Sequence, residues 1–245
     1  MKTWKDITLR QFNKIQDLLQ EIDEYTTLNI IDVLYDVDSA NMPAMELMNK
    51  YAHSLDFLTT TIPTNEKLKE IYTINQREYN SNINLTQMTT AQFVDYQNYS
   101  KENPVDISKC LSVFIIPKGH TYNDGYDLKQ VQDDIKDLDM VTINTLAFFF
   151  QKIIHSIIGN YPALFDSGYE EDEHSDREER GNLEPTQTNR FSEFGILPYI
   201  ISFCQSTNHT LNETFELPIN LVLYVVSYNI QLERANAEEL KKLRK

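Results

Sequence analysis

The sequence predicts a mainly α-helical protein: a helical domain with a small β-hairpin, an acidic linker, and then a helical C-terminal unit. Three observations predict this fold class. Apolar residues recur at spacings of three and four along most of the 245 residues, which is the period of an amphipathic helix. Two capping-box motifs mark helix starts. The stretch near residues 68–83 changes to a shorter period, which indicates strands.

Composition and charge set the broad class of the protein. Lys and Arg number 22 against 37 Asp and Glu, so the formal net charge is −15. This acidity disfavours a sequence-specific or general nucleic-acid binder, because phosphate binding needs a clustered positive field. Glycine accounts for only 6 residues, which disfavours enzymes whose glycine turns cradle phosphates. The two cysteines supply neither a disulfide framework nor a cysteine-based zinc site.

Three helices are expected before residue 60. The capping box from Thr8 to Gln11 opens the first, over 9–22. A second helix is expected over 27–35, and a proline at its first turn opens a third over 43–58. Because these helices are short and closely spaced, we expect them to form a small compact unit.

A β-hairpin is expected near 68–83. Asn75 and Gln76 form its two-residue turn, between strands at 70–74 and 77–83. A two-stranded hairpin is marginal by itself, so it needs a helix to pack against.

A second capping box, Thr89 to Gln92 followed by Phe93, repeats the pattern Thr-x-x-Gln-Phe that begins at Thr8. Repeated use of the same helix-start chemistry is the favoured explanation. Internal duplication is the alternative, although no other segment aligns at that offset.

The middle of the chain is apolar and largely helical. Residues 107–116 form a helix or a strand, 128–138 form a helix, and 141–158 form a long apolar helix. Polar residues interrupt that last segment, which favours a buried helix over a membrane span. The first six residues lack the apolar run of a signal peptide.

Residues 166–190 mark the clearest boundary. They contain nine acids and three arginines, a net charge of −6, and almost no aliphatic residues. Such a segment buries too little apolar area to offset its ordering entropy, so we interpret it as a linker or mobile loop. The expected organisation is therefore a helical domain over 1–165, the linker, and a C-terminal helical unit over 191–245.

Three helices are expected in the C-terminal unit. They cover 191–206, 210–217 and a last segment opened by Pro218, whose tail is charged and solvated.

Motifs that carry chemistry are lacking in the sequence. The five histidines have no metal-ligand spacing, and residues 123–127 resemble a glycine turn followed by a helix cap more than a calcium loop. Phosphate loops, nucleophile elbows and dinucleotide fingerprints do not occur. We therefore expect a protein that is not an enzyme and has no catalytic, cofactor or metal residues. A hydrolase with an unrecognised carboxylate pair is the remote alternative.

Aromatic residues supply the candidate partner-binding positions. Fourteen Tyr, twelve Phe and one Trp make up 11% of the chain, and such rings suit interfaces. The candidates are Trp4, Phe148, Phe149 and Tyr199. The run from Phe148 to Phe150 covers more than one helix face, so part of it is expected to contact another helix layer or another subunit. Core packing alone remains the favoured explanation for that run.

Several segments resemble small helical tail-assembly proteins of tailed bacteriophages. They are the opening Trp-Lys-Asp-Ile-Thr-Leu-Arg-Gln-Phe at 4–12, its echo at 85–93, the Ile-Pro-Lys-Gly segment within 114–126, and the pieces at 194–197 and 217–219. The resemblance implies a chaperone that binds the tape-measure protein during tail assembly. That family has no catalytic residues to transfer.

A virion protein is the other phage interpretation, and it is our first expectation. The Asn-, Ile- and Tyr-rich, Gly-poor composition suits virion proteins of gut phages with AT-rich genomes. In short-tailed phages of that kind, helical proteins of this size build rings that join portal to tail. We therefore expect a head–tail connector or tail-ring subunit that self-associates and contacts portal or other tail proteins. We expect it to bind no sequence-specific nucleic acid and no membrane. Its expected location is the virion, after assembly in the host cytoplasm; the chaperone alternative is absent from the mature virion.

Overall fold

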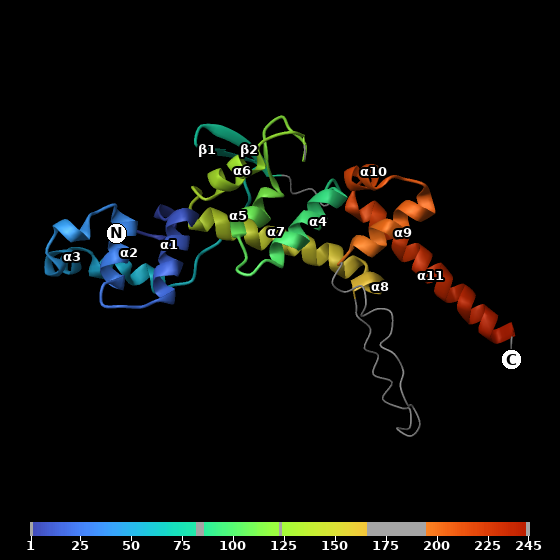
Figure 1. The fold of residues 1–245 in the computed structure, drawn as a ribbon, viewed down its shortest axis with the longest axis horizontal. Helices are drawn as coiled ribbons and strands as arrows, with labels where there is room; N and C mark the ends of the chain where they lie inside the picture. The colour runs from blue at the N-terminus through green and yellow to red at the C-terminus, as the bar shows by residue number, and fades with distance from the viewer. Residues whose placement is uncertain (1, 82–85, 123, 166–194, 244–245) are drawn as a thin grey trace, which may run out of the picture. The chain divides into compact units, whose positions relative to one another are not determined.

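The computed structural model of the chain describes residues 2–81, 86–122, 124–165 and 195–243 (Figure 1). Over these ranges the protein is mainly helical with one small antiparallel sheet, which confirms the predicted fold class. The predicted acidic linker, 166–190, lies outside the described residues.

The chain forms two compact units, each built from two segments. The first unit contains Met1–Asn82 and Asp106–Lys152, and the second contains Ile83–Val105 and Ile153–Lys245. Their boundaries differ from those of the predicted domains 1–165 and 191–245. A helix from the middle of the chain lies in the same unit as the C-terminal helices. No local sequence pattern predicts this grouping.

The first unit begins with the three predicted helical segments. The Thr8 hydroxyl accepts a hydrogen bond from the Gln11 amide at 3.2 Å, and the Gln11 side chain accepts one from the Thr8 amide at 3.1 Å. This reciprocal cap satisfies two backbone donors and fixes the helix start as predicted. The elements are η1 (Trp4–Asp6), α1 (Leu9–Gln20), α2 (Thr26–Tyr35), η2 (Ser39–Asn41), α3 (Ala44–Tyr51) and η3 (Ala52–Thr59).

The predicted hairpin is present as β1 (Ile71–Ile74) and β2 (Arg77–Ser81). Asn75 and Gln76 both have positive φ, 49° and 66°, so the turn twists in the sense that antiparallel strands require. Tyr72 pairs with Tyr79 across the two strands.

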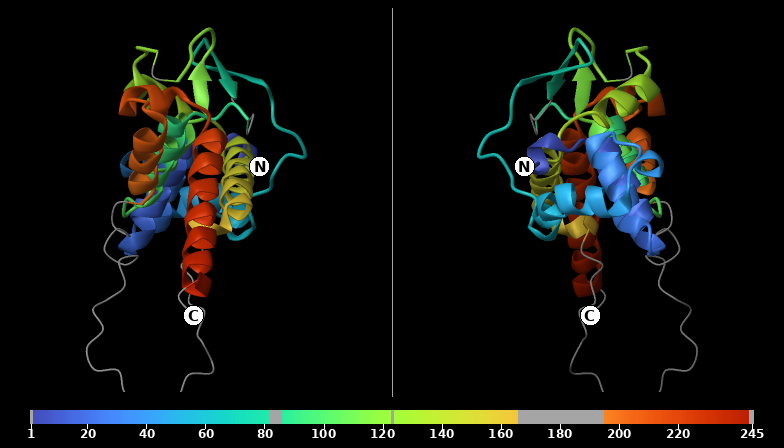
Figure 2. Two further views of the ribbon diagram at one scale, coloured as in Figure 1. Left: turned by 90° about the vertical axis from the view of Figure 1, so that its right-hand side faces the viewer. Right: turned by 90° about the vertical axis from the view of Figure 1, so that its left-hand side faces the viewer.

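The apolar segment 107–116 contains both of its alternatives, a helix and then a strand. It forms α5 (Ile107–Ser112) and then β3 (Ile115–Pro117), which pairs with β2 and completes the sheet order β1-β2-β3. The strands stand together at the top of both views in Figure 2. Helix α6 (Leu128–Ile135) packs against α5 and β3, so the hairpin has the helical support that it needs.

The long helix α7 (Met140–Asn160) begins in the first unit and ends in the second. Its buried residues include Ile143, Leu146 and Phe150, and the Phe150 ring stacks on Phe114 with centroids 4.1 Å apart. Among the helices described, α7 is the one long and apolar enough to cross a membrane by length and composition, and 50% of its most apolar window is buried inside the fold.

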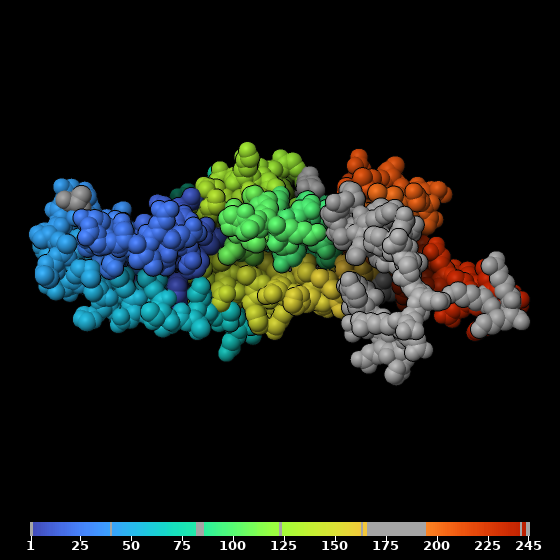
Figure 3. Space-filling view, turned by 60° about the horizontal axis from the view of Figure 1, so that its bottom comes forward, coloured from blue at the N-terminus to red at the C-terminus, as the bar shows by residue number. Residues whose placement is uncertain are grey.

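The second unit packs helices from two parts of the sequence. They are α4 (Thr90–Ser100), α8 (Pro162–Phe165), α9 (Leu197–Thr207), α10 (Leu211–Glu216) and α11 (Ile219–Leu243). The side chains at its centre are Phe93, Ile200, Phe203, Val222 and Leu223, all at most 2% exposed. Helix α11 is continuous, and its end lies beyond α9 and α10 (Figures 1 and 3).

Candidate functional site

A buried carboxylate organises the polar side of the first unit. The Asp134 side chain, on α6, is 3% exposed and accepts hydrogen bonds from four side chains. The donors are Arg77 Nη1 at 2.9 Å, Gln130 Nε2 at 3.0 Å, Asn75 Nδ2 at 3.1 Å and the Tyr79 hydroxyl. They come from the hairpin turn, from β2 and from α6 itself. We call Asp134 and these four residues the Asp134 cluster.

The cluster connects to the first helix of the chain. Asn75 Nδ2 also donates to Asp137 at 2.9 Å, and Arg10 Nε donates to the same carboxylate at 2.8 Å. Arg10 Nη1 further contacts Asp133 at 3.2 Å. The network therefore ties α1, the hairpin turn and the end of α6 together, over sequence separations that no local pattern covers.

The pKa values of Asp134 and Tyr79 favour a structural role for the cluster. Burial by itself raises the pKa of the Asp134 carboxyl, but the hydrogen bonds from Tyr79, Asn75, Arg77 and Gln130 outweigh burial and hold this pKa below its usual value. Burial, with the adjacent Asp134 carboxylate, raises the pKa of Tyr79 to about 12. A general acid needs a carboxyl with a raised pKa and a free position for proton transfer. The Asp134 carboxyl has a lowered pKa and is occupied by four donors, so it is suited to holding the hairpin on α6.

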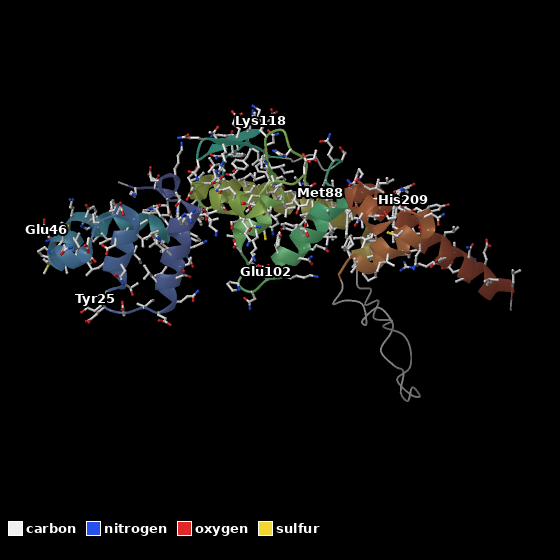
Figure 4. All side chains as sticks on the ribbon, turned by 45° about the horizontal axis from the view of Figure 1, so that its top comes forward. Tyr25, Glu46, Met88, Glu102, Lys118 and His209 are labelled. Carbon is white, nitrogen blue, oxygen red and sulfur yellow. The ribbon has the colours of Figure 1, made fainter. Side chains whose placement is uncertain are left out.

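An open depression of about 590 Å³ lies beside the cluster. Its Lys and Arg wall residues both face acids: Lys118 Nζ contacts Glu78 at 2.6 Å, and Arg77 Nη1 contacts Asp134 at 2.9 Å. Lys118 lies at the sheet side of this unit (Figure 4). Because Lys118 and Arg77 already face acids, the depression offers little net positive charge to a small anion.

Within the described ranges, the His, Cys, Asp and Glu side chains form no group of three or more that could hold a metal ion together.

Trp4, the first predicted partner-binding residue, lies in the core of the first unit. Its ring is 7% exposed and contacts Phe12 and Phe57 edge-on, with centroids 6.1 and 5.2 Å away. Its indole nitrogen donates to Thr60 Oγ1 at 3.1 Å. The ring and its donor are thus used inside the fold, which gives Trp4 a packing role.

The phenylalanine run divides between core and surface. Phe150 is 1% exposed, Phe149 is half-buried and Phe148 is 42% exposed. Lys152 Nζ lies over the Phe148 ring, 4.2 Å from its centroid. One side of the run therefore faces outward, and its role in binding a partner stays a prediction.

Tyr199, the remaining candidate, lies in the second unit. It is half-buried, and its hydroxyl donates to the Leu164 carbonyl at 3.0 Å. The predicted residues are divided between the two units: Trp4, Phe148 and Phe149 belong to one and Tyr199 to the other.

Helix α11 carries an apolar surface that the sequence analysis did not single out. Leu221, Tyr224, Tyr228 and Leu232 are 47%, 62%, 56% and 46% exposed. Their spacings of three, four and four place them on one side of the helix. We call these four residues the α11 outer face. The sequence already contained a sign of this face. Apolar residues lie on two opposite sides of α11, and only one of these sides can face the core of its own unit.

The inner side of α11 fills the core of the second unit. Ile219, Val222, Leu223 and Val226 are each at most 1% exposed. The helix is thus anchored on one side and apolar on the other. An apolar, tyrosine-containing outer face on an anchored helix is typical of a protein–protein contact surface.

Comparison with known proteins supplies no homologue. No family profile matches the chain, and neither a curated protein sequence nor a solved structure matches it significantly. The α11 outer face is the feature of the described residues that points most directly to a function.

Proposed function

We propose that this protein is a non-enzymatic structural subunit of a tailed phage, part of the head–tail connector or a tail ring, acting through symmetric contacts between copies. The observation that carries the proposal is the α11 outer face. A structural subunit must present apolar surface that becomes buried on assembly, and this face presents two tyrosines and two leucines on a helix anchored in its own core.

The size of the surface supports an interaction role. At roughly 200 Å² for a tyrosine side chain, Tyr224 and Tyr228 alone expose roughly 240 Å². With the two leucines, the outer face reaches the few hundred Å² at which exposed apolar patches mark interaction sites. Tyrosine also tolerates water before assembly, because its hydroxyl stays hydrated while its ring is buried.

The phage context comes from the resemblance of segments 4–12, 85–93 and 114–126 to tail-assembly proteins. In this proposal the partners are further copies of the chain together with portal or other tail proteins. The protein assembles in the host cytoplasm and remains in the virion.

Mass spectrometry of purified particles of a phage that encodes this chain tests the proposal. We expect the chain to be present, at a copy number close to that of the portal protein. Absence from particles together with abundance in infected-cell lysate would contradict the proposal and favour the alternative, a tail assembly chaperone that binds the tape-measure protein and leaves.

A further inference from the structure

We infer that the α11 outer face of one copy pairs with the α11 outer face of a second copy, with the two helices antiparallel. The inference rests on the proposed function, since it names the contact by which copies associate. Its occupant is a second copy of this chain, and three features of α11 argue for that occupant.

The first feature is the spacing of apolar residues along the helix. Leu221, Val225, Tyr228, Leu232 and Ala235 follow one another at intervals of four, three, four and three residues. This is the heptad repeat of a helix that packs along another helix. Val225 is half-buried at the edge of the fold, and the other four are exposed. We call these five residues the seam. It continues from the anchored part of α11 into the exposed part of the helix.

The second feature is the exposed end of α11. From 231 to 240, and again at 242 and 243, every side chain is exposed. A helical segment of this length is marginal in water unless another element packs on it. Leu240 and Leu243 are 56% and 84% exposed. In the antiparallel pair, Leu232 at the start of this segment packs on Leu221 of the second copy, so pairing extends the support of α11 beyond its own unit.

The third feature is charge. The whole chain has a net charge of −15, yet residues 219–232 contain no charged residue, and Ile219–Leu243 contains three acids and three bases. Two acidic copies can approach along this neutral stretch without bringing like charges together. A strongly basic or acidic partner finds no opposite charge on the seam, so a second copy fits it better.

The direction follows from the same charges. Parallel pairing in register places Glu239 against Glu239 of the second copy, and Lys242 against Lys242, in the seam. Antiparallel pairing around the middle of the uncharged stretch instead gives layers of Leu221 with Leu232, and of Val225 with Tyr228. All of these layers are apolar, and the charged ends then lie outside the paired stretch.

An antiparallel contact of this kind is isologous and closes with two copies. In a ring, such a pair is the building unit, and a second contact joins one pair to the next. The α11 contact is therefore testable on the purified full-length chain without any phage component.

Sedimentation velocity over a concentration series measures the association. We expect the wild-type chain to be dimeric and Leu232→Glu to raise the dimer dissociation constant by at least about tenfold. Ile201→Glu, on α9, is the matched control, because Ile201 and Leu232 are both 46% exposed. It should leave association unchanged. Tyr228→Glu, at a layer residue that is 56% exposed, is a second disrupting variant, and circular dichroism verifies that each variant is folded.

Spin labels at Lys242→Cys, with Cys110→Ala and Cys204→Ser to remove the native thiols, report the direction. In the antiparallel pair, each label lies about 15 residues from the midpoint, so the labels are roughly 45 Å apart at about 1.5 Å per residue. In a parallel pair they lie within roughly 20 Å, because paired helix axes are about 8–10 Å apart. A short distance overturns the antiparallel arrangement.

Two other results overturn the inference. One is a wild-type chain that is monomeric at every concentration, with α11 protected from hydrogen exchange only when another protein is added. The other is a dimer that Leu232→Glu does not weaken. Failure here is distinguishable from failure of the proposed function: a chain found in particles but monomeric when purified refutes only the α11 contact. An antiparallel dimer missing from particles refutes only the virion role.

Discussion

Thr8 and Thr89 occupy equivalent positions in two helix junctions of the same construction. Each threonine caps a helix through a capping box with a glutamine three residues later. Each also forms an isolated antiparallel bridge with the residue just before a long helix: Thr8 with Asp139, before α7, and Thr89 with Pro218, before α11. Each compact unit contains one such junction.

The backbone hydrogen bonds of the two junctions correspond one to one. They are Leu9 N to Leu138 O at 3.0 Å and Met140 N to Ile7 O at 2.8 Å, matched by Thr90 N to Leu217 O at 2.8 Å and Ile219 N to Met88 O at 2.9 Å. Met88 lies at the start of α4 (Figure 4). The repeated Thr-x-x-Gln-Phe motif thus has a tertiary role beyond helix capping, and internal duplication gains a structural argument while it stays a prediction.

Removing one of these caps should destabilise the second unit. Thr89→Ala removes the acceptor of the Gln92 amide, which lies 3.2 Å from Thr89 Oγ1. We expect a loss of about 1 kcal/mol in the free energy of unfolding, measured by urea denaturation. Thr89→Ser keeps the hydroxyl and should recover most of this loss. Equal stability of Thr89→Ala and wild type would refute the cap.

The Asp134 cluster should contribute strongly to stability. Asp134→Asn removes the charge that Arg77 and the Tyr79 hydroxyl face, and we expect a loss of about 2 kcal/mol in urea denaturation. Asp133→Asn is the control on the same helix, because the Asp133 side chain is 57% exposed and its ion pair with Arg10 is on the surface. It should lose less than about 1 kcal/mol. Similar losses in both variants would contradict a clamp centred on Asp134.

Acid should weaken the fold through the same carboxylates. In the folded protein the pKa of Asp134 and that of Asp137 lie below their usual value, since hydrogen bonds outweigh burial at both. A depressed carboxyl pKa contributes stability above the unfolded value of about 3.9. This contribution is lost as the pH falls through the folded pKa. The urea concentration at the denaturation midpoint should therefore fall as the pH drops below about 4. This fall should be less steep in Asp134→Asn than in the wild type.

Alkali should act on Tyr79 in the opposite sense. Its folded pKa of about 12 lies above the usual value for tyrosine, so its neutral form is favoured in the fold. The resulting stability is present below about pH 10 and is lost as the pH rises toward 12. Tyr79→Phe lacks this proton and should show a shallower decline over that interval. An identical decline in both proteins would exclude Tyr79 as its source.

The phenylalanine run should respond position by position. Phe150→Ala leaves a cavity beside Phe114, and we expect a loss of about 3–5 kcal/mol. Phe148→Ala removes an exposed ring and its contact with Lys152, so it should lose about 1 kcal/mol or less. Thermal unfolding compares the two. If Phe148→Ala also prevents particle assembly while the chain stays folded, the predicted partner role of this side is supported.

Local chemistry determined much of this fold from the sequence alone. Asn75 and Gln76 adopt positive φ, and the threonine caps at 8 and 89 begin helices where expected, because each feature depends on residues within four positions of one another. The helical class follows for the same reason, since the apolar period is set by the helix itself.

Tertiary structure decided which apolar residues face the core. Periodicity gives α11 two apolar sides without saying which one packs, and only the neighbouring helices bury Val222 and leave Tyr228 exposed. Trp4 was equally suited to an interface, and Phe12 and Phe57 enclose it. The sequence contains 37 acids and does not distinguish Asp134 among them; the hairpin, more than fifty residues earlier, brings three of its four donors to it. These outcomes depend on long-range packing, which the spacing of residues along a chain does not encode.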